Sequence, residues 1–157
     1  MPGSAAAGIV SGMRYLGIDI GTKRTGLAIS DATGLIARPL EVIGSGADPQ
    51  ALARSLRPIV EREEVEALVV GLPRRMGGED GPEAEHAREA ARQLEAVLGL
   101  PATLWDERLT TVEATARLIE AGVRRKQRKA VVDKVAAALI LQSFLDSQYE
   151  ATAEPRT

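Results

Sequence analysis

The order of apolar runs and turns along this chain most constrains its fold. The first part carries three runs typical of strands, joined by short glycine-containing turns; they span residues 15–19, 27–30 and 36–43. Farther along, strand patterns alternate with helical patterns. A meander of three strands followed by such an alternation predicts an α/β fold, with a five-stranded mixed sheet flanked by helices on both sides.

Local signals place the later elements. Asp48 followed by Pro49 is typical of a helix N-cap with proline in the first turn. Pro39, inside the third run, indicates an edge strand or a bulge. Two further strands are expected at 65–70 and 102–105, and helices are expected to begin at Pro49, Pro82, Thr110 and Val131 and to end, for the last two, near Ala121 and Ser147.

Length and composition exclude several classes of protein. The 157 residues suffice for one domain with its own core, which we place at 13–148 between a flexible extension at 1–12 and a flexible tail at 149–157. No stretch approaches the roughly 20 apolar residues of a membrane span, so we expect a cytoplasmic protein. With no cysteine and a single histidine, any metal must be held by oxygen, which favours Mg²⁺ or Mn²⁺. We interpret His86 as a surface or helix-packing residue and Trp105 as a core residue.

Acidic residues stand where predicted elements begin or end. Asp19 closes the first strand, Asp106 and Glu107 close the fifth, and Asp133 lies early in the last helix. Such carboxylates can converge on a hard divalent cation. Asp106 and Glu107 point in opposite directions if the strand continues through both, so we expect one to be a ligand and the other a cap or salt-bridge residue. Each acid alone also fits a structural role, as a turn former or as a helix-end charge.

Basic residues gather beside these acidic positions, although the net charge is only −2. Neutralisation of phosphates by Lys and Arg is the sequence-independent part of nucleic-acid affinity. We therefore favour nucleic-acid binding over a solvated charged surface. Because aromatic residues make up only 3% of the chain, we expect contacts to the backbone and shape of the nucleic acid to dominate over base stacking. The cations are Lys23, Arg24, Arg74, Arg75, Arg108, Arg124, Arg125, Lys126, Arg128 and Lys129.

Four motifs in order along the chain resemble those of the YqgF/RuvX family. They are Gly17–Gly26, Gly71-Leu72-Pro73, Asp106–Thr111 and Val132–Ala137. The resemblance implies an RNase H-like fold and a metal-dependent endonuclease related to Holliday junction resolvases, with a role in maturing the 5′ end of pre-16S rRNA during ribosome biogenesis.

The same resemblance implies which residues act. Asp19, Glu107 and Asp133 would be the catalytic carboxylates and would hold Mg²⁺ or Mn²⁺. The choice of Glu107 over Asp106 rests on the resemblance and not on spacing. One departure stands out after Pro73, where the family often continues with Leu-Asn-Met-Asp-Gly and this chain has Arg74-Arg75-Met76-Gly77-Gly78. The two added cations suggest a loop that attracts phosphate.

Three other functions stay open at this point. A Holliday junction resolvase would cut four-way DNA by the same chemistry, and cutting two strands would call for a symmetric homodimer. Sugar kinases and actin-like ATPases share an Asp-x-Gly-Thr pattern, but they need two such subdomains and this chain is too short for both. A non-catalytic RNA-binding factor would bind nucleic acid without cutting it. The expected partner is a nucleic acid, either precursor rRNA or branched DNA.

Overall fold

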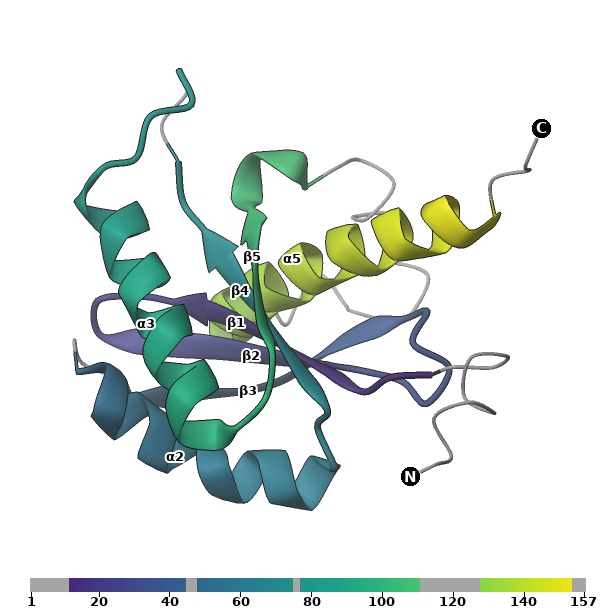
Figure 1. The fold of residues 1–157 in the computed structure, drawn as a ribbon, viewed down its shortest axis with the longest axis horizontal. Coiled ribbons are helices and arrows are strands. Elements are labelled where there is room, and N and C mark those ends of the chain that lie inside the picture. The colour runs from purple at the N-terminus through teal and green to yellow at the C-terminus, as the bar shows by residue number, and fades with distance from the viewer. Residues whose placement is uncertain (1–11, 45–47, 75–76, 111–127, 154–157) are drawn as a thin grey trace.

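A computed structural model describes residues 12–44, 48–74, 77–110 and 128–153 of the chain. The order of the elements within these residues is the predicted one. The predicted helix from Thr110 to Ala121 lies, apart from its first residue, outside the described residues. The elements are β1 (Tyr15–Ile20), β2 (Arg24–Ser30), β3 (Ala37–Gly44), α2 (Pro49–Glu63), β4 (Ala67–Leu72), α3 (Pro82–Leu98), β5 (Ala102–Asp106), the 3₁₀ turn η1 (Glu107–Leu109) and α5 (Arg128–Ala153) (Figure 1).

The five strands form one mixed sheet in the order β3-β2-β1-β4-β5, which confirms the predicted architecture. β2 pairs antiparallel with both β1 and β3, whereas β4 runs parallel to β1 and to β5. Gly17 stands opposite Val69, and Gly71 stands opposite Trp105. The carboxyl ends of β1, β4 and β5 therefore meet at one edge of the sheet, the edge at which α/β proteins bind their ligands.

The structure confirms the prediction from Pro39 of an edge strand or a bulge. β3 is an edge strand, and its pairing with β2 shifts between Leu27, which stands opposite Glu41, and Ala28, which stands opposite Pro39. Leu40 is the extra residue of a β-bulge. Because an edge strand at a bulge does not need every N–H for the ladder, Pro39 is accommodated there.

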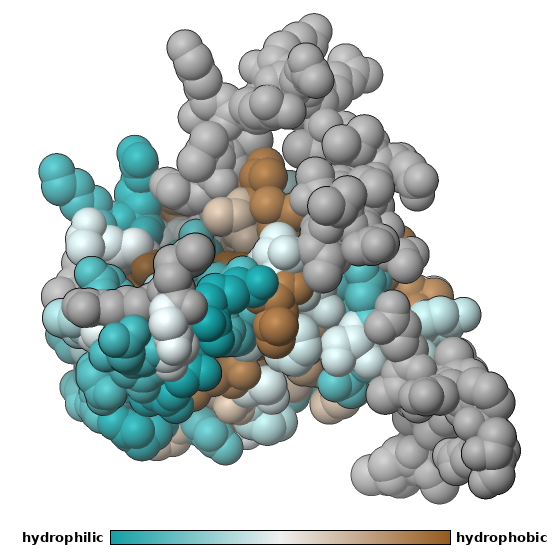
Figure 2. All heavy atoms as spheres, turned by 90° about the horizontal axis from the view of Figure 1, so that it is seen from above, coloured by the Kyte–Doolittle hydropathy of each residue, from teal (hydrophilic) through white to brown (hydrophobic). Residues whose placement is uncertain are grey.

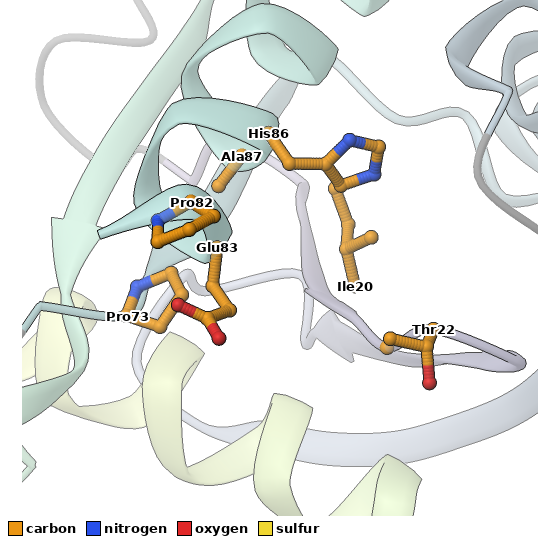
Figure 3. A pocket seen from close by; sticks show the side chains of 8 residues that line it. Ile20, Thr22, Pro73, Pro82, Glu83, His86 and Ala87 are labelled. Carbon is orange, nitrogen blue, oxygen red and sulfur yellow. The ribbon is translucent and has the colours of Figure 1, made fainter. Parts of the chain in front are cut away.

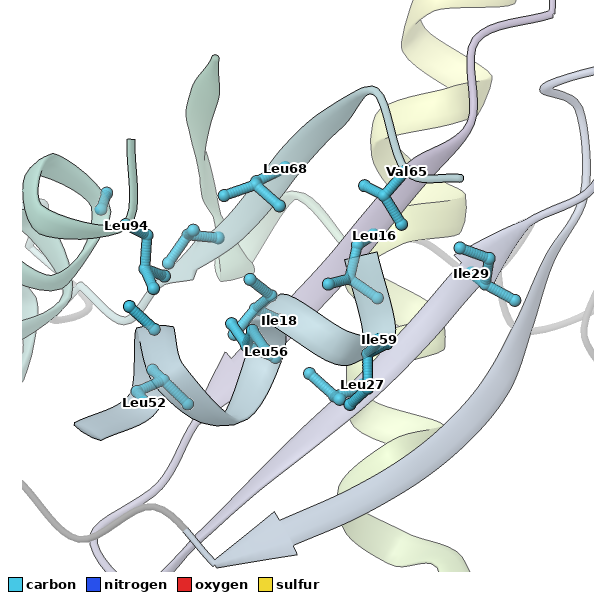
Figure 4. Packing of buried hydrophobic residues seen from close by; sticks show 13 residues of the cluster. Leu16, Ile18, Leu27, Ile29, Leu52, Leu56, Ile59, Val65, Leu68 and Leu94 are labelled. Atoms are coloured by element: carbon cyan, nitrogen blue, oxygen red, sulfur yellow. The ribbon is translucent and has the colours of Figure 1, made fainter. Parts of the chain in front are cut away.

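Helices α2 and α3 cover one face of the sheet (Figure 1). Alternate residues of the strands point into this layer, and Leu16, Ile18 and Leu68 are fully buried beneath Leu56 of α2 (Figure 4). Each buried side chain of this size contributes about 1.5–3 kcal/mol. α2 begins at the predicted cap, where the carboxylate of Asp48 accepts a hydrogen bond from the backbone N–H of Gln50 at 3.0 Å.

Helix α5 packs on the opposite face (Figure 1). Its Phe144 makes edge-on ring contacts with Tyr15 at 5.1 Å and with Trp105 at 5.5 Å, so Trp105 does pack against the core. α5 begins at Arg128 and continues to Ala153, past the predicted domain end at residue 148, because the residues that follow are good helix formers such as alanine and glutamate. No helix in the described ranges has the length and hydropathy of a membrane span.

Candidate functional site

Asp19 lies on the face of the sheet that α5 covers. Successive residues of a strand point to opposite faces. Leu16 and Ile18 enter the core beneath α2, whereas Tyr15 contacts Phe144 of α5. Asp19 shares the side of Tyr15 and lies one residue before the end of β1. Its side chain is therefore half-buried at the carboxyl edge of the sheet, under the path of α5.

Glu107 reaches the same side from β5. The strand ends at Asp106, and Glu107 opens η1. A Cβ atom on Gly71 of β4 would lie 2.8 Å from Glu107 Oε2 and 2.7 Å from Ile140 Cδ1 of α5. The Glu107 carboxylate consequently lies over the backbone of Gly71, between the sheet and α5.

Gly71 provides the space that the Glu107 carboxylate occupies over β4. β4 runs between β1 and β5, and the pairing of Ile18 with Val70 places Gly71 beside Asp19. A side chain at position 71 would meet the Glu107 carboxylate and Ile140 of α5, and one of them would have to shift. In the sequence, Gly71 stands out only as part of a strand end and a motif, and its steric role is not visible there.

The surroundings of Glu107 raise the pKa of its carboxyl group to about 7. Burial is the largest cause, because it disfavours the ionised form. The negative charges of Asp19 and then Asp106 act in the same direction. Closely spaced carboxylates with poor solvation are typical of functional sites, and they form an arrangement that a bound cation would relieve.

Asp106 has a different role. Its carboxylate accepts hydrogen bonds from Arg108 Nη2 at 2.7 Å and from the backbone N–H of Arg108 at 2.9 Å, and it lies 3.8 Å from Arg74 Nη1. The side-chain hydrogen bond from Arg108 is the largest cause that lowers the pKa of Asp106. Of the two neighbouring acids, Asp106 is thus the cap and salt-bridge residue, whereas Glu107 is the one whose pKa the charge of Asp19 raises.

The path of α5 brings the backbone of the third predicted carboxylate toward this edge. Phe144 packs against Tyr15 at the start of β1, and a Cβ atom on Gly17, farther along β1, would lie 2.8 Å from Leu141 Cβ. α5 therefore runs antiparallel to β1. The backbone at Asp133, about two turns before Leu141, lies toward the carboxyl end of β1. The side chain of Asp133 is outside the described part of the structure.

The described carboxylates suit a hard cation by type. Asp19 and Glu107 offer the oxygen ligands that Mg²⁺ and Mn²⁺ prefer. Within the described residues, no group of three or more His, Cys, Asp or Glu side chains could hold a metal ion. The side chain of Asp133 is not among the described ones. The oxygen donors of this pair match a hard divalent ion in type, and the binding of such an ion by Asp19, Glu107 and Asp133 stays a prediction.

Several of the predicted cations lie at the same edge. Lys23 and Arg24 are exposed in and just after the turn that follows β1. Arg74 forms an ion pair with Asp80 at 3.2 Å, and Arg108 pairs with Asp106, so these two cations also hold the loop after β4 and the turn η1. Figure 2 shows the molecule from above, with hydrophilic side chains gathered on one side of the view and hydrophobic side chains near the centre of the view. The other predicted cations lie outside the described part of the structure, either as whole residues or as side chains: Arg75, Arg124, Arg125 and Lys126, and the side chains of Arg128 and Lys129.

Known proteins have sequences similar to this one over most of its length. A family model described as "RuvX: Holliday junction resolvase" matches residues 13–147. A protein of Pelotomaculum thermopropionicum named "Putative pre-16S rRNA nuclease" is 50% identical over 136 residues, which cover 87% of this chain and 88% of that protein. A protein of Listeria monocytogenes with the same name is 48% identical over 136 residues, which cover 86% of this chain and 99% of that protein.

The arrangement of elements is also found in solved structures. RuvC of Thermus thermophilus is similar with a TM-score of 0.55 and 17% identity, over 87% of this chain and 96% of that chain. At this identity the likeness concerns the fold alone. It confirms the RNase H-like fold that the four motifs imply.

Proposed function

This chain belongs to the RuvX family, and on that premise we propose that it is a divalent-metal-dependent endonuclease that processes the 5′ end of pre-16S rRNA in ribosome biogenesis. The names of its relatives support the substrate. The nuclease domain would extend from residue 13 to the end of α5, with residues 1–12 as an extension. A location in the cytoplasm, where rRNA precursors are processed in bacteria, follows from this role.

One observation carries the proposal. The Glu107 carboxylate lies over Gly71, and its burial together with the negative charges of Asp19 and Asp106 raises the pKa of Glu107 to about 7. We infer that the carboxylates of Asp19 and Glu107 hold Mg²⁺ or Mn²⁺, with Asp133 as the third ligand. Bound divalent ions would activate water and neutralise the charge that develops on the phosphodiester. Asp19 and Glu107 would hold the ions in place, because Asp19 lies near the end of β1 and Glu107 directly follows the end of β5.

Some of the basic residues would stabilise the fold through ion pairs, and others would contact the phosphates of the substrate. Arg74 and Arg108 are paired with Asp80 and Asp106, which reduces the charge they present to a phosphate. The other predicted cations would also contact phosphates. These are the exposed Lys23 and Arg24, together with Arg75, Arg124, Arg125, Lys126, Arg128 and Lys129. Each such contact contributes to a salt-dependent affinity.

Replacement of one carboxylate tests the mechanism. Asp19→Asn keeps the size of the side chain but removes a charge that an ion requires, so cleavage of precursor rRNA in Mn²⁺ should be lost while RNA binding persists. Asp48→Asn is the matched control, because it makes the same chemical change at a helix cap where asparagine serves as well as aspartate. Undiminished turnover by the Asp19→Asn variant would refute the assignment.

The same incubation separates the alternatives. Precursor rRNA and a four-way DNA junction are offered in parallel, each with Mn²⁺ and with EDTA. Faster cutting of the junction would make the chain a resolvase, which the description of the family model favours, and a dimer should then be found by light scattering. Salt-dependent binding of RNA without metal-dependent cutting of either substrate would identify a non-catalytic RNA-binding factor.

A further inference from the structure

A cavity of about 270 Å³ lies at the end of β1, where Ile20 directly follows Asp19 (Figure 3). One wall comes from Ile20 and Thr22, at the end of β1 and in the turn after it. Pro73, just after β4, forms another part. Glu83 and His86, in the first turns of α3, complete the lining. The cavity thus joins the same edge of the sheet from the side opposite α5.

The position of the cavity relative to Asp19 suits a neighbouring nucleotide. Ile20 follows Asp19 directly and points to the opposite face of the sheet. Thr22 is three residues beyond Asp19, so their Cα atoms are at most about 11 Å apart at ~3.8 Å per residue. A nucleic-acid strand with a phosphate at Asp19 can therefore turn its next base over the end of β1 and into the cavity.

The lining offers apolar walls and uncommitted polar groups. Within the described residues, the side chains of Thr22, Glu83 and His86 make no hydrogen bond or ion pair. In Figure 3 the His86 ring lies beside Ile20. The volume is below the roughly 300–1,000 Å³ typical of sites for drug-sized ligands, which suits a single planar ring system better than a whole nucleotide.

We propose that this cavity binds one unstacked base of the RNA strand whose phosphate lies at Asp19. The proposal rests on the nuclease function proposed above. RNA-binding proteins commonly take up unpaired bases on aromatic side chains, histidine included. His86 would stack on the base. The carboxylate of Glu83 would accept a hydrogen bond from the exocyclic amino group of the base. Cytosine carries such a group and uracil does not, so cytosine should bind better than uracil.

Mononucleotides test the cavity without any cleavage. CMP, UMP and ribose 5-phosphate are titrated into the full chain in EDTA, and the NMR signals of Thr22 and Ala87, which both line the cavity, are followed. We expect CMP to shift these signals at lower concentration than UMP, and ribose 5-phosphate to leave them in place. Equal shifts by all three compounds would overturn the proposal, because they would show binding through phosphate alone.

Variants assign the roles of the two side chains. His86→Ala should weaken CMP binding about tenfold, in line with the effect of removing an aromatic stacking partner. His86→Phe should restore most of the affinity, which a purely structural role of the histidine would not predict. Glu83→Gln should reduce the preference for CMP over UMP. Glu85→Gln is the matched control, since Glu85 is exposed on the same helix and does not line the cavity. Unchanged CMP affinity in His86→Ala would overturn the proposal.

Cleavage assays separate this inference from the proposed function. If the chain cuts precursor rRNA in Mn²⁺ but His86→Ala leaves KM and base preference unchanged, the nuclease assignment holds and the base site is refuted. If no RNA is cut but CMP binding depends on His86, the base site is supported and the nuclease assignment fails.

Discussion

Glu107→Gln should stabilise the metal-free protein at pH 8. The wild-type carboxylate is buried beside Asp19, and these surroundings oppose its ionisation, so its pKa rises from 4.5 to about 7. Glutamine has the same shape and no charge. The variant should therefore lose the unfavourable free energy of a buried charge and be more stable than the wild type. Such a gain is expected where a functional group lowers the stability of the fold.

The size of the effect follows from the shift in pKa. The difference between about 7 in the folded chain and 4.5 in the unfolded chain corresponds to about 3 kcal/mol, at ~1.36 kcal/mol per pKa unit. The side chain is only partly buried, and solvent screening reduces this value to about 1–2 kcal/mol.

The sign of the pH dependence is also determined. Between pH 4.5 and 7 the folded chain holds the Glu107 proton more tightly than the unfolded chain does. Wild-type stability therefore falls as the pH rises through this interval. The advantage of the glutamine variant should be full above pH 7 and should nearly vanish by about pH 4.5.

Urea unfolding in EDTA at pH 8 and pH 5 measures this difference. Trp105, the single tryptophan of the chain, packs against Phe144 and reports unfolding by its fluorescence. Glu95→Gln, an exposed position on α3, should show no difference from the wild type at either pH. An equally stable or less stable Glu107→Gln variant at pH 8 would show that Glu107 is neither desolvated nor close to Asp19.

Three further predictions concern the surroundings of the site. Gly71→Ala should destabilise the fold by only about 1 kcal/mol, because the atoms that the added methyl group would meet at 2.7 and 2.8 Å are the far ends of the Ile140 and Glu107 side chains, which can shift. Gly44→Ala, which meets no atom within 4 Å, should leave the urea midpoint nearly unchanged. Ser143→Ala should cost about 1–3 kcal/mol, because Trp105 Nε1 loses its acceptor at 3.0 Å, and equal urea midpoints would contradict this. Asp106→Asn should destabilise the protein at pH 7, since the lowered pKa of Asp106 stabilises the fold while the group is ionised. The difference in urea unfolding should stay full above the ordinary pKa of 3.8 and should shrink as the pH falls below it. A difference that does not change with pH would argue against its ion pairs.

Local patterns were sufficient for most of the fold. The apolar runs and the helix caps identified the five strands and the three described α-helices, though not the 3₁₀ turn η1, and Pro39 indicated that β3 is an edge strand or carries a bulge. These signals suffice because burial and backbone geometry constrain neighbouring residues. They also predicted that Asp106 and Glu107 would have opposite roles. The carboxyl end of α5 was placed too early, since helix-forming residues continue past the last contact with the sheet.

The sequence by itself determined which chemical groups are present: an oxygen-only set of ligands, the order of the strands that carry them and the family motifs. Tertiary structure decided how those groups meet. Only the parallel register of β1, β4 and β5 places Gly71 between Asp19 and Glu107, and only the packing of α3 beside the end of β1 forms a cavity at His86. The physical reason is that strand pairing and helix packing join residues far apart in the chain, whereas turn, cap and periodicity signals act only between near neighbours.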